Sequence, residues 1–369
     1  MTAERFSKWF VAVIALFVAI NAVVWFKFTN QILARQGDAI IGDLARMGYI
    51  TDLVHPRVNH TDLARRHLES GDYQGQRVDL VTLGDSFSQG AGGGPNRFYQ
   101  DHIATKMGWT VLNLRDPPAS RSPIETAMAL ADTGFLRRAG VRYLLIEATQ
   151  RKLVERLSNP AHLTSSLSQK QLDEFYRFGN GEKTAFNFAL PDTSFINNGN
   201  IKYLIYKGLY PFHDCALISD TCRVRLDARL FSIGNGNEML FYKNDMRAIK
   251  KHTRENIQRL NTTLNALAVH LSQKGVTLIL MPAVSKFDLY RDHFTNQNYP
   301  RDPLFNLLRQ QQRNYLLLDT KAILGDGVRA GERDIFFVDD THWASPASQR
   351  IAQALHKLLD TSNQLKTGN

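Results

Sequence analysis

A serine and a histidine lie near opposite ends of this 369-residue chain, each in a short motif suited to acyl-transfer chemistry. Ser86 stands in Gly-Asp-Ser-Phe-Ser, just after an apolar run at residues 78–83. Far along the chain, Asp340 and His342 are separated by one residue. A serine hydroxyl becomes a good nucleophile when an imidazole takes its proton and a carboxylate orients that imidazole. The sequence therefore predicts a nucleophile in one motif and its base and orienting acid in the other.

The elements that must position these side chains follow the pattern of a parallel sheet. Short apolar runs alternate with helical stretches, so we expect an α/β domain with helices on both faces of the sheet. In such sheets the functional loops gather at the carboxyl ends of the strands, which would place Ser86 and Arg115 on one rim. The runs that we predict as strands are residues 78–83, 110–114, 143–146, 276–281 and 315–318.

Residues 9–26 are almost wholly apolar and are interrupted by Asn21. The run has about the 20 residues that a membrane-spanning helix needs, and it is longer than the apolar core of a cleaved signal peptide. We therefore expect an uncleaved transmembrane anchor over residues 9–27, with a cytoplasmic tail at residues 1–8. Basic residues flank the span on both sides, so the positive-inside signal is weak, but it favours an external catalytic region.

The sequence pattern divides the rest of the chain into a stalk, a catalytic domain and a segment without strand–helix alternation. Residues 28–72 are expected to form a stalk, with a short amphipathic helix around residues 40–47 against the membrane or the domain. Strand–helix alternation assigns residues 73–162 and 245–369 to the catalytic domain. Residues 163–244 lack this alternation, and we expect either an insertion that shapes the cleft or a small separate domain.

Two cysteines, Cys215 and Cys222, lie close together in the predicted insertion. In an exported domain this spacing predicts a local disulfide. A metal site would need a second pair of ligands at a suitable spacing, which the sequence lacks. We therefore predict a disulfide and no metal.

The net charge of +10 favours anionic surroundings, such as lipid headgroups or an acidic polymer. The basic residues are spread along the chain without a nucleic-acid motif, so a solvated basic face is expected and a nucleic-acid partner is not. The glycine-rich run at residues 90–94 lacks the Lys-Ser/Thr of a nucleotide loop. No cofactor is predicted.

The two motifs together resemble a known family. Residues 84–88 resemble the nucleophile motif of the SGNH (GDSL) hydrolase superfamily. Residues 340–343, Asp-Thr-His-Trp, resemble the motif of its alginate O-acetyltransferase branch, whose membrane-linked or periplasmic members acetylate exopolysaccharide. The resemblance covers residues 75–160 and 245–360, and it implies a three-layer, flavodoxin-like SGNH hydrolase fold.

Carried over residue by residue, the resemblance makes Ser86 the nucleophile, His342 the general base and Asp340 the orienting acid. Asp339 is the alternative acid, because many hydrolases of the superfamily place an Asp three residues before the His. The spacing Asp-x-His and the Trp that follows favour Asp340.

The expected oxyanion-binding residues are replaced in this chain. The superfamily usually has a Gly after the second strand and Gly-x-Asn-Asp after the third. Here those places hold Arg115 and residues 147–150, Glu-Ala-Thr-Gln. Arg115 is the candidate for contact with the oxyanion or a substrate carboxylate, with a surface arginine as the alternative. Glu147 and Arg151 are expected to form an ion pair that supports the rim.

Three more side chains are candidates for substrate contact. Lys286 and Tyr290 lie in a predicted loop at a strand end, where they either bind sugar hydroxyls and acids or are simply solvated. Trp343 either stacks on a sugar ring or packs beside the histidine.

The resemblance implies an acetyl-serine intermediate whose acetyl group passes to a hydroxyl of a polysaccharide. It also implies a membrane-bound O-acyltransferase partner that delivers the donor. The expected location is the bacterial inner membrane, with a single span and the catalytic domain in the periplasm. The alternatives are an esterase with the same triad and water as acceptor, or an inactive polysaccharide-binding scaffold.

Overall fold

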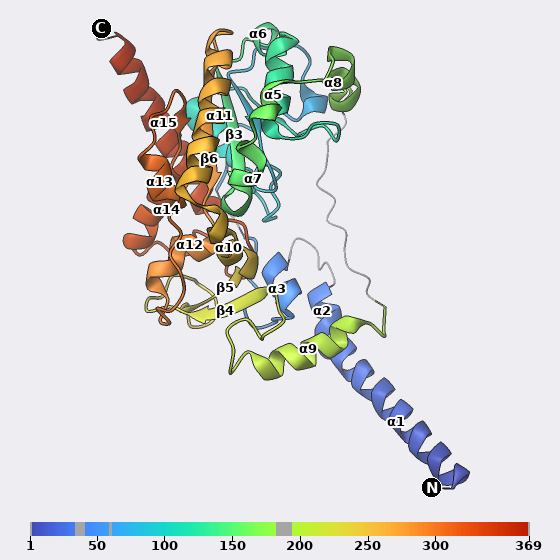
Figure 1. Cartoon of the computed structure of the whole chain (residues 1–369). Helices are drawn as coiled ribbons and strands as arrows, with labels where there is room; N and C mark the ends of the chain where they lie inside the picture. The colour runs from blue at the N-terminus through green and yellow to red at the C-terminus, as the bar shows by residue number, and fades with distance from the viewer. Residues whose placement is uncertain (1, 34–40, 59–60, 182–193, 368–369) are drawn as a thin grey trace.

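The structure is a computed structural model, and it describes residues 2–33, 41–58, 61–181 and 194–367. A long apolar helix, α1 (Ala3–Val24), points away from a body that contains a central sheet (Figure 1). The helix continues through a π-helical turn, η1 (Trp25–Thr29), into α2 (Asn30–Leu33). Among the described residues, one helical stretch, Ala3–Thr29, is long and apolar enough to cross a membrane. A membrane anchor and a signal sequence share this character.

Five parallel strands form the central sheet in the order β2-β1-β3-β6-β7. Each lies within or overlaps one of the predicted apolar runs, and the four longer strands are almost wholly buried, as expected when helices cover both faces of a parallel sheet. The predicted α/β fold with a parallel sheet is therefore confirmed. The strands are β1 (Leu80–Leu83), β2 (Val111–Leu114), β3 (Tyr143–Thr149), β6 (Thr277–Ala283) and β7 (Leu316–Leu317).

The register brings the ends of three strands to one edge. Leu83, the last residue of β1, pairs with Leu114 of β2 and with Ile146 of β3. β3 then continues to Thr149, beyond the point at which β1 gives way to the turn that carries Ser86. Ser86, the predicted nucleophile, therefore lies beside the final residues of β3.

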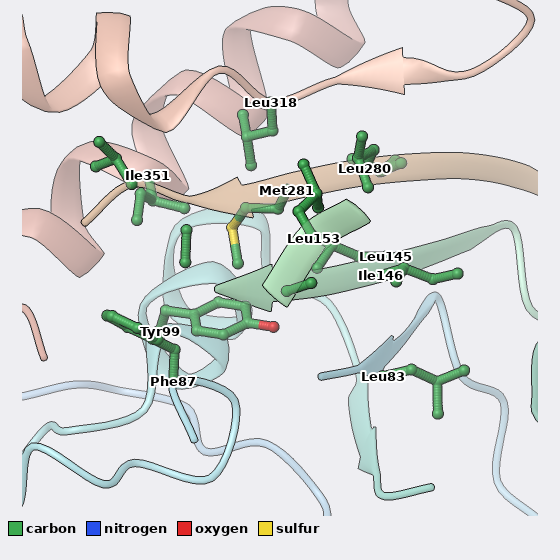
Figure 2. Close-up of a cluster of buried hydrophobic side chains, with 14 of the residues drawn as sticks. Leu83, Phe87, Tyr99, Leu145, Ile146, Leu153, Leu280, Met281, Leu318 and Ile351 are labelled. Carbon is green, nitrogen blue, oxygen red and sulfur yellow. The ribbon is translucent and has the colours of Figure 1, made fainter. Parts of the chain in front are cut away.

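Two groups of helices cover the sheet and complete three layers. Figure 2 shows buried side chains of β3 and β6 packed with Leu153 of α7, Ile351 of α15 and Tyr99 of α4. One group is α5 (Pro123–Asp132), α7 (Leu153–Leu157) and α11 (Arg254–Ser272); the other is α4 (Tyr99–Met107), α14 (Thr320–Arg329) and α15 (Ser345–Thr367). Shorter helices are α6 (Phe135–Arg138), α10 (Lys243–Ala248), α12 (Lys286–Tyr290) and α13 (Leu304–Arg309).

The helix α11 forms for reasons that are visible in the sequence. The Thr253 hydroxyl caps its first turn by accepting a hydrogen bond from the Asn256 N–H. Apolar residues then recur at intervals of three and four, which places them on one face. That face is fully buried and consists of Ile257, Leu260, Leu264, Leu267 and Leu271.

The segment predicted to be a stalk is part of the body. α3 (Asp43–Gly48) buries Leu44 and Ala45 in the main core. Gly42 approaches the histidine motif so closely that a Cβ atom there would lie 2.1 Å from the Asp339 carbonyl oxygen. The expectation of a stalk is therefore wrong for residues 41–58, because their apolar and polar groups are engaged by the catalytic body.

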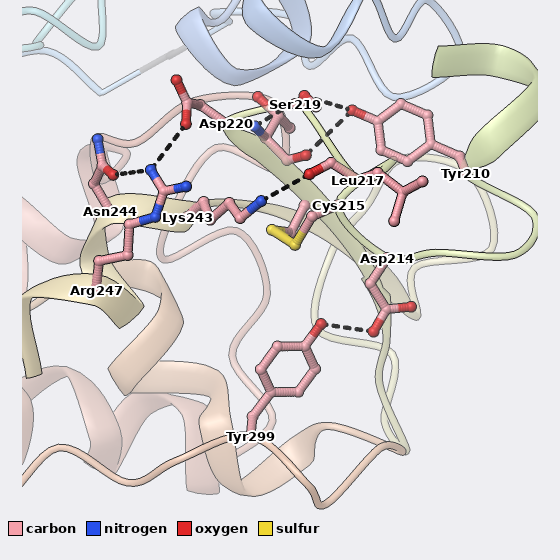
Figure 3. Close-up of a disulfide and its surroundings, with 12 residues drawn as sticks. Tyr210, Asp214, Cys215, Leu217, Ser219, Asp220, Lys243, Asn244, Arg247 and Tyr299 are labelled. Carbon is pink, nitrogen blue, oxygen red and sulfur yellow. Dashed lines mark hydrogen bonds and ion pairs between the residues drawn. A yellow bond between two sulfur atoms is a disulfide. The ribbon is translucent and has the colours of Figure 1, made fainter. Parts of the chain in front are cut away.

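The predicted insertion contains more regular structure than its sequence indicates. It holds α8 (Gln169–Tyr176), α9 (Asn198–Leu209) and an antiparallel pair, β4 (Thr221–Arg225) and β5 (Glu238–Tyr242). A disulfide joins Cys215, in the loop before β4, to Cys222 in β4 (Figure 3).

Candidate active site

Ser86, His342 and Asp340 form a continuous hydrogen-bonded relay. Ser86 Oγ lies 2.8 Å from His342 Nε2, although the residues are 256 positions apart. On the other side of the ring, His342 Nδ1 lies 2.7 Å from Asp340 Oδ1. A carboxylate at Nδ1 holds the tautomer in which Nε2 can accept the serine proton. The three side chains thus have the arrangement that acyl transfer by an activated serine requires.

The turn that carries Ser86 is held by hydrogen bonds to the buried carboxyl group of Glu147 on β3. Glu147 Oε2 accepts hydrogen bonds from the Asp85 N–H at 2.9 Å, the Ser88 N–H at 3.3 Å and the Ser88 hydroxyl at 2.9 Å. Gly84 makes this approach possible, since a Cβ atom there would lie 2.5 Å from the same carboxylate oxygen. Burial and the charge of Asp85 raise the pKa of Glu147 well above its usual range, which favours the neutral acid.

The expected ion pair between Glu147 and Arg151 does not form. Arg151 lies 3.1 Å from Asp245 Oδ1 and over the ring of Tyr242. The prediction was wrong because β3 buries Glu147 beneath the nucleophile turn, whereas Arg151 follows the end of the strand in a separate turn.

The segment before His342 is held by the buried ammonium group of Lys286 on α12. Lys286 Nζ donates to the carbonyl oxygens of Phe337 and Val338 at 2.9 Å and of Asp340 at 2.8 Å. Burial lowers the pKa of Lys286 to about 7. The predicted contact of Lys286 with substrate is therefore wrong, because its side chain is inside the body and faces the backbone of the histidine turn.

Arg57, from the segment after α3, lies between two neighbouring acids. Its guanidinium is 2.7 Å from Asp339 Oδ1 and 3.2 Å from Asp340 Oδ2, and the ion pairs are buried. Asp339 also accepts a hydrogen bond from the Gly42 N–H at 2.9 Å. Of the two candidates for the orienting acid, the structure places Asp340 against the ring of His342 and engages Asp339 with Arg57 and Gly42.

Another carboxylate, Asp43 at the start of α3, lies at the histidine turn. Asp43 accepts hydrogen bonds from the Thr341 N–H at 2.7 Å and from its hydroxyl at 2.5 Å. Asp43 Oδ2 is 4.0 Å from His342 Nδ1, and the Asp43 N–H donates to Asp340 Oδ2 at 3.2 Å. Asp43 therefore fixes this turn and adds negative charge beside the imidazole.

These charges set the protonation of the relay. Burial lowers the pKa of His342, but the hydrogen bond and charge of Asp340, with the charge of Asp43, outweigh burial and raise it above the ordinary value. Burial would raise the pKa of Asp340, yet its hydrogen bond to His342 and the charges of His342 and Arg57 lower it. Asp340 is thus ionised, as an orienting acid must be.

Tyr290 and Trp343 belong to the core next to the histidine turn. Tyr290 is fully buried and packs on Phe231 and Phe336, with ring centroids 5.2 Å and 6.3 Å away. Trp343 is buried against Phe87 at 4.3 Å. Their burial contradicts the predicted substrate contacts, and packing beside the histidine is the role of Trp343 that fits.

A pocket with a volume of about 510 Å³ opens beside Ser86 and Arg115. Thr149, at the end of β3, also lines it, and the Thr149 N–H donates to Asp85 Oδ2 at 3.0 Å. The Thr149 hydroxyl is buried without a hydrogen-bond partner in the part of the chain that the structure describes. Further lining residues are Gln89, Asp116, Arg151, Lys152, Arg156 and Phe175.

Asp43, Asp340 and His342 also bring three potential metal ligands within 4.8 Å of one another. Both ring nitrogens of His342 are engaged, one by Asp340 and the other by Ser86. A metal would have to displace one of these bonds, so we interpret the group as a catalytic relay and assign it no metal.

Asp43 and Arg57 lie at the site although neither was predicted there from the sequence, and the partner predicted for Glu147 was wrong. A charged residue outside a motif is normally interpreted as solvated, because charges are rarely buried unless they are paired. The apolar spacing around residues 40–47 was a usable signal, since it indicated a helix against the domain. It did not identify the surface that this helix covers.

The family comparison agrees with the geometry of the histidine half of the site. Residues 236–369 match the family model described as SGNH hydrolase-like domain, acetyltransferase AlgX. A search of curated proteins finds no match to the chain. The matched region contains Asp340 and His342, and the fold brings Ser86 to it from outside. Residues 236–369 therefore resemble the SGNH hydrolase-like domain of the AlgX acetyltransferase family, and a domain of this family implies an SGNH-type acetyltransferase.

Proposed function

We propose that this enzyme is extracytoplasmic and transfers an acetyl group to a hydroxyl of an anionic polysaccharide through an acetyl-Ser86 intermediate. The observation that carries the proposal is the relay from Ser86 Oγ to His342 Nε2 and from His342 Nδ1 to Asp340, with separations of 2.8 Å and 2.7 Å. The family match supports acetyl as the transferred group and a polysaccharide as the acceptor.

In the first half-reaction, Ser86 Oγ attacks the carbonyl carbon of the acetyl donor while its proton passes to His342 Nε2. The bond between the acetyl carbon and the leaving group then breaks, and His342 returns the proton to that group. Asp340 stabilises the transient imidazolium. The acetyl group remains as an ester on Ser86.

In the second half-reaction, a sugar hydroxyl gives its proton to His342 Nε2 and attacks the acetyl-Ser86 ester. The bond to Ser86 Oγ breaks, and the proton moves from His342 to that oxygen. The products are an acetylated sugar and the free serine. The same base thus serves both halves, with Asp340 in the same position throughout.

Thr149 is our candidate for the missing oxyanion donor, together with the backbone N–H of Ser86. It occupies the place of the Asn in Gly-x-Asn-Asp, as this sequence aligns with the superfamily pattern. The bond from the Thr149 N–H to Asp85 holds it beside the nucleophile, and its buried hydroxyl has no other partner among the described residues. A buried hydroxyl needs an acceptor, and the developing oxyanion would supply one.

The charge of the pocket supports an anionic acceptor. Four basic side chains and two acidic ones line it, and a second pocket shares Arg151 and Lys152 and continues the basic surface with Arg247, Lys250 and Lys251. Arg115 lines this pocket, and the sequence pattern also predicted it at the same edge of the sheet as Ser86. Carboxylates of uronic-acid sugars would match such a surface, because arginine binds carboxylate in a bidentate manner.

We also propose that α1 is an uncleaved anchor in the bacterial inner membrane, with the catalytic body in the periplasm. The disulfide between Cys215 and Cys222 supports an oxidising compartment. A site close to the bilayer could receive acetyl from a membrane-bound O-acyltransferase, the partner that the family resemblance implies.

The test uses the full chain in detergent, with Ser86→Ala as the matched control. The enzyme is incubated with p-nitrophenyl acetate, with and without an oligouronide, and is then examined by mass spectrometry. We expect one acetyl group on the peptide that contains Ser86 and acetylated oligouronide in the complete mixture, and neither product with Ser86→Ala.

Two results would overturn this proposal. Equal labelling of the wild type and Ser86→Ala would remove Ser86 as the nucleophile. Acetate release at the same rate with and without sugar, and without any acetylated sugar, would make the protein an esterase.

A further inference from the structure

The helix α9 is locked to α1 by a buried polar cluster. Asn200 Nδ2 donates to Asn21 Oδ1 at 3.0 Å, and the Thr29 hydroxyl donates to Asn200 Oδ1 at 2.5 Å. All three side chains are buried. An asparagine inside an apolar span is costly unless another element satisfies it, so Asn21 marks a helix–helix contact. Its partner here belongs to a segment about 180 residues away in sequence.

Apolar packing continues this contact toward the end of α1. Val24, Ile32 and Tyr203 form a separate buried cluster, with Phe28 packed against it. The rings of Tyr203 and Phe28 stack with centroids 4.7 Å apart. One face of α9 is therefore covered by the last turns of the apolar helix and by Tyr49, and Figure 1 shows α9 lying across that end.

The opposite face of α9 is apolar, and none of the residues that the structure describes covers it. Ile201, Leu204 and Ile205 follow the spacing i, i+3, i+4 and are 49%, 47% and 42% exposed. The loop after the helix adds three more exposed apolar side chains, Phe212, Leu217 and Ile218. An exposed apolar stripe of this kind marks a surface that a membrane or another molecule covers.

The position of Asn21 along the apolar helix indicates what covers the exposed face of α9. Asn21 lies five residues before Phe26, the end of the apolar run, which is about 7–8 Å of helix. An interfacial helix buries its apolar face about 5–10 Å into the boundary between headgroups and acyl chains. With α1 in a bilayer, α9 would lie at this boundary, and Lys202 and Lys207 would be positioned for anionic headgroups.

We infer that α9 is an interfacial helix whose Ile201, Leu204 and Ile205 face inserts into the lipid bilayer and fixes the height of the active site above it. This inference rests on the proposed role of α1 as a membrane anchor. The partner is the lipid surface itself, and not a second copy of the chain or the acetyl donor's transporter.

A path of contacts connects α9 to the active site. The Tyr210 hydroxyl, at the end of α9, donates to the Thr221 carbonyl oxygen of β4 at 3.2 Å (Figure 3). The Thr221 hydroxyl donates to the Leu44 carbonyl oxygen of α3 at 2.9 Å. α3 begins with Asp43, which holds the turn of His342. The orientation of α9 in the membrane would therefore orient the catalytic relay as well.

The test places a single environment-sensitive fluorophore on the full chain in vesicles of phosphatidylethanolamine and phosphatidylglycerol that contain brominated lipid. Because both native cysteines form a disulfide, Leu204→Cys introduces one free thiol. Val269→Cys on α11 is the matched control, since Val269 is exposed to 46% and lies on the catalytic body. Phe17→Cys on α1 reports the anchor.

We expect bromolipid to quench the fluorophore strongly at positions 17 and 204 and to leave position 269 unchanged. Quenching at 17 without quenching at 204 would overturn the inference about α9 and leave the anchor intact. The absence of quenching at 17 would overturn the anchor and this inference together, without bearing on the Ser86 chemistry, because the readout does not use activity. A crosslink between two copies through position 204, in place of quenching, would assign the face to self-association and overturn the inference.

Discussion

The two turns that meet at the active site are held in different ways. The turn of Ser86 rests on one buried carboxyl group, Glu147, whose raised pKa favours the neutral form. The turn of His342 contains the charged Asp339 and is surrounded by charged groups from remote parts of the chain: Asp43, Arg57 and Lys286. The nucleophile is thus positioned mainly by hydrogen bonds to a neutral carboxyl group, with one ion pair from Asp85 to Arg156 at 3.2 Å, and the base is positioned by a network of ion pairs. Changes in charge should therefore damage the second turn far more than the first.

The largest expected effect comes from the acid of the relay. Asp340→Asn should lower kcat by about 10⁴-fold, because an amide at this position favours the wrong histidine tautomer. Asp339→Asn is the matched control, and it should cost much less activity, because Asp339 bonds to Arg57 and Gly42. Rates of Ser86 acetylation measure both. Similar losses for the two variants would mean that the assignment of Asp340 is incorrect.

Removal of the buried guanidinium should show how the histidine turn depends on charge. Arg57→Met leaves Asp339 and Asp340 without their buried partner, which should lower the free energy of unfolding by about 3–5 kcal/mol. Glu147→Gln keeps a neutral hydrogen-bonding group beneath Ser86 and should cost about 1 kcal/mol or less. Urea denaturation followed by fluorescence compares the two. An equal decrease in the free energy of unfolding for both variants would show that the two turns do not differ in their dependence on charge.

In the surroundings of Ser86, removal of the Thr149 hydroxyl should lower the rate more than removal of any other single hydroxyl. Thr149→Val keeps the shape and removes the donor, so kcat should fall by about 10²- to 10³-fold, with little change in the free energy of unfolding. Thr149→Ser should restore most of the rate, since it returns the hydroxyl. If the valine variant retains full activity, another group must bind the oxyanion.

The smallest expected effect concerns the pH profile. Because the pKa of His342 is raised above 6.5, activity should be lost as the pH falls through a midpoint higher than for an ordinary histidine. Asp43 contributes to this increase, so Asp43→Asn should move the midpoint to lower pH. The profile of kcat/KM against pH measures the shift. An unchanged midpoint would show that Asp43 acts through Thr341 alone.

The same pKa makes a prediction for stability with a definite sign. Folding raises the pKa of His342, so protonation of its ring favours the folded state. This contribution is complete below the unfolded pKa near 6.5 and is lost as the pH rises through the raised value. Folding also raises the pKa of Glu147, so its contribution has the same sign and is lost as the pH rises from its unfolded pKa near 4.5 through the raised value.

The parts of the fold that follow local periodicity were predictable from the sequence. The five strands and α11 were visible as apolar runs and as a helical stripe, because burial of one face needs only nearby residues in the right order. The motifs around Ser86 and His342 also predicted the chemistry. The sequence did not reveal that Gly42 lies against Asp339, since residues 297 positions apart leave no local pattern.

Buried charges explain the remaining errors. Lys286 was expected at a solvated rim, yet three carbonyl oxygens satisfy its ammonium group inside the body. Glu147 was assigned to Arg151, yet it lies beneath the nucleophile turn. Whether a charged side chain is buried depends on its partners in space, and those partners are known only once the chain has folded.

The course of residues 41–58 has a practical consequence for shortening this enzyme to a soluble form. A chain that begins at residue 73, where the sequence pattern suggests a boundary, would lack Asp43 and Arg57. Two acidic groups in its interior would then lose their counter-charge, and such a fragment should aggregate or bind substrate without turnover. A soluble form that works must begin before Gly42 and retain the residues that follow the anchor.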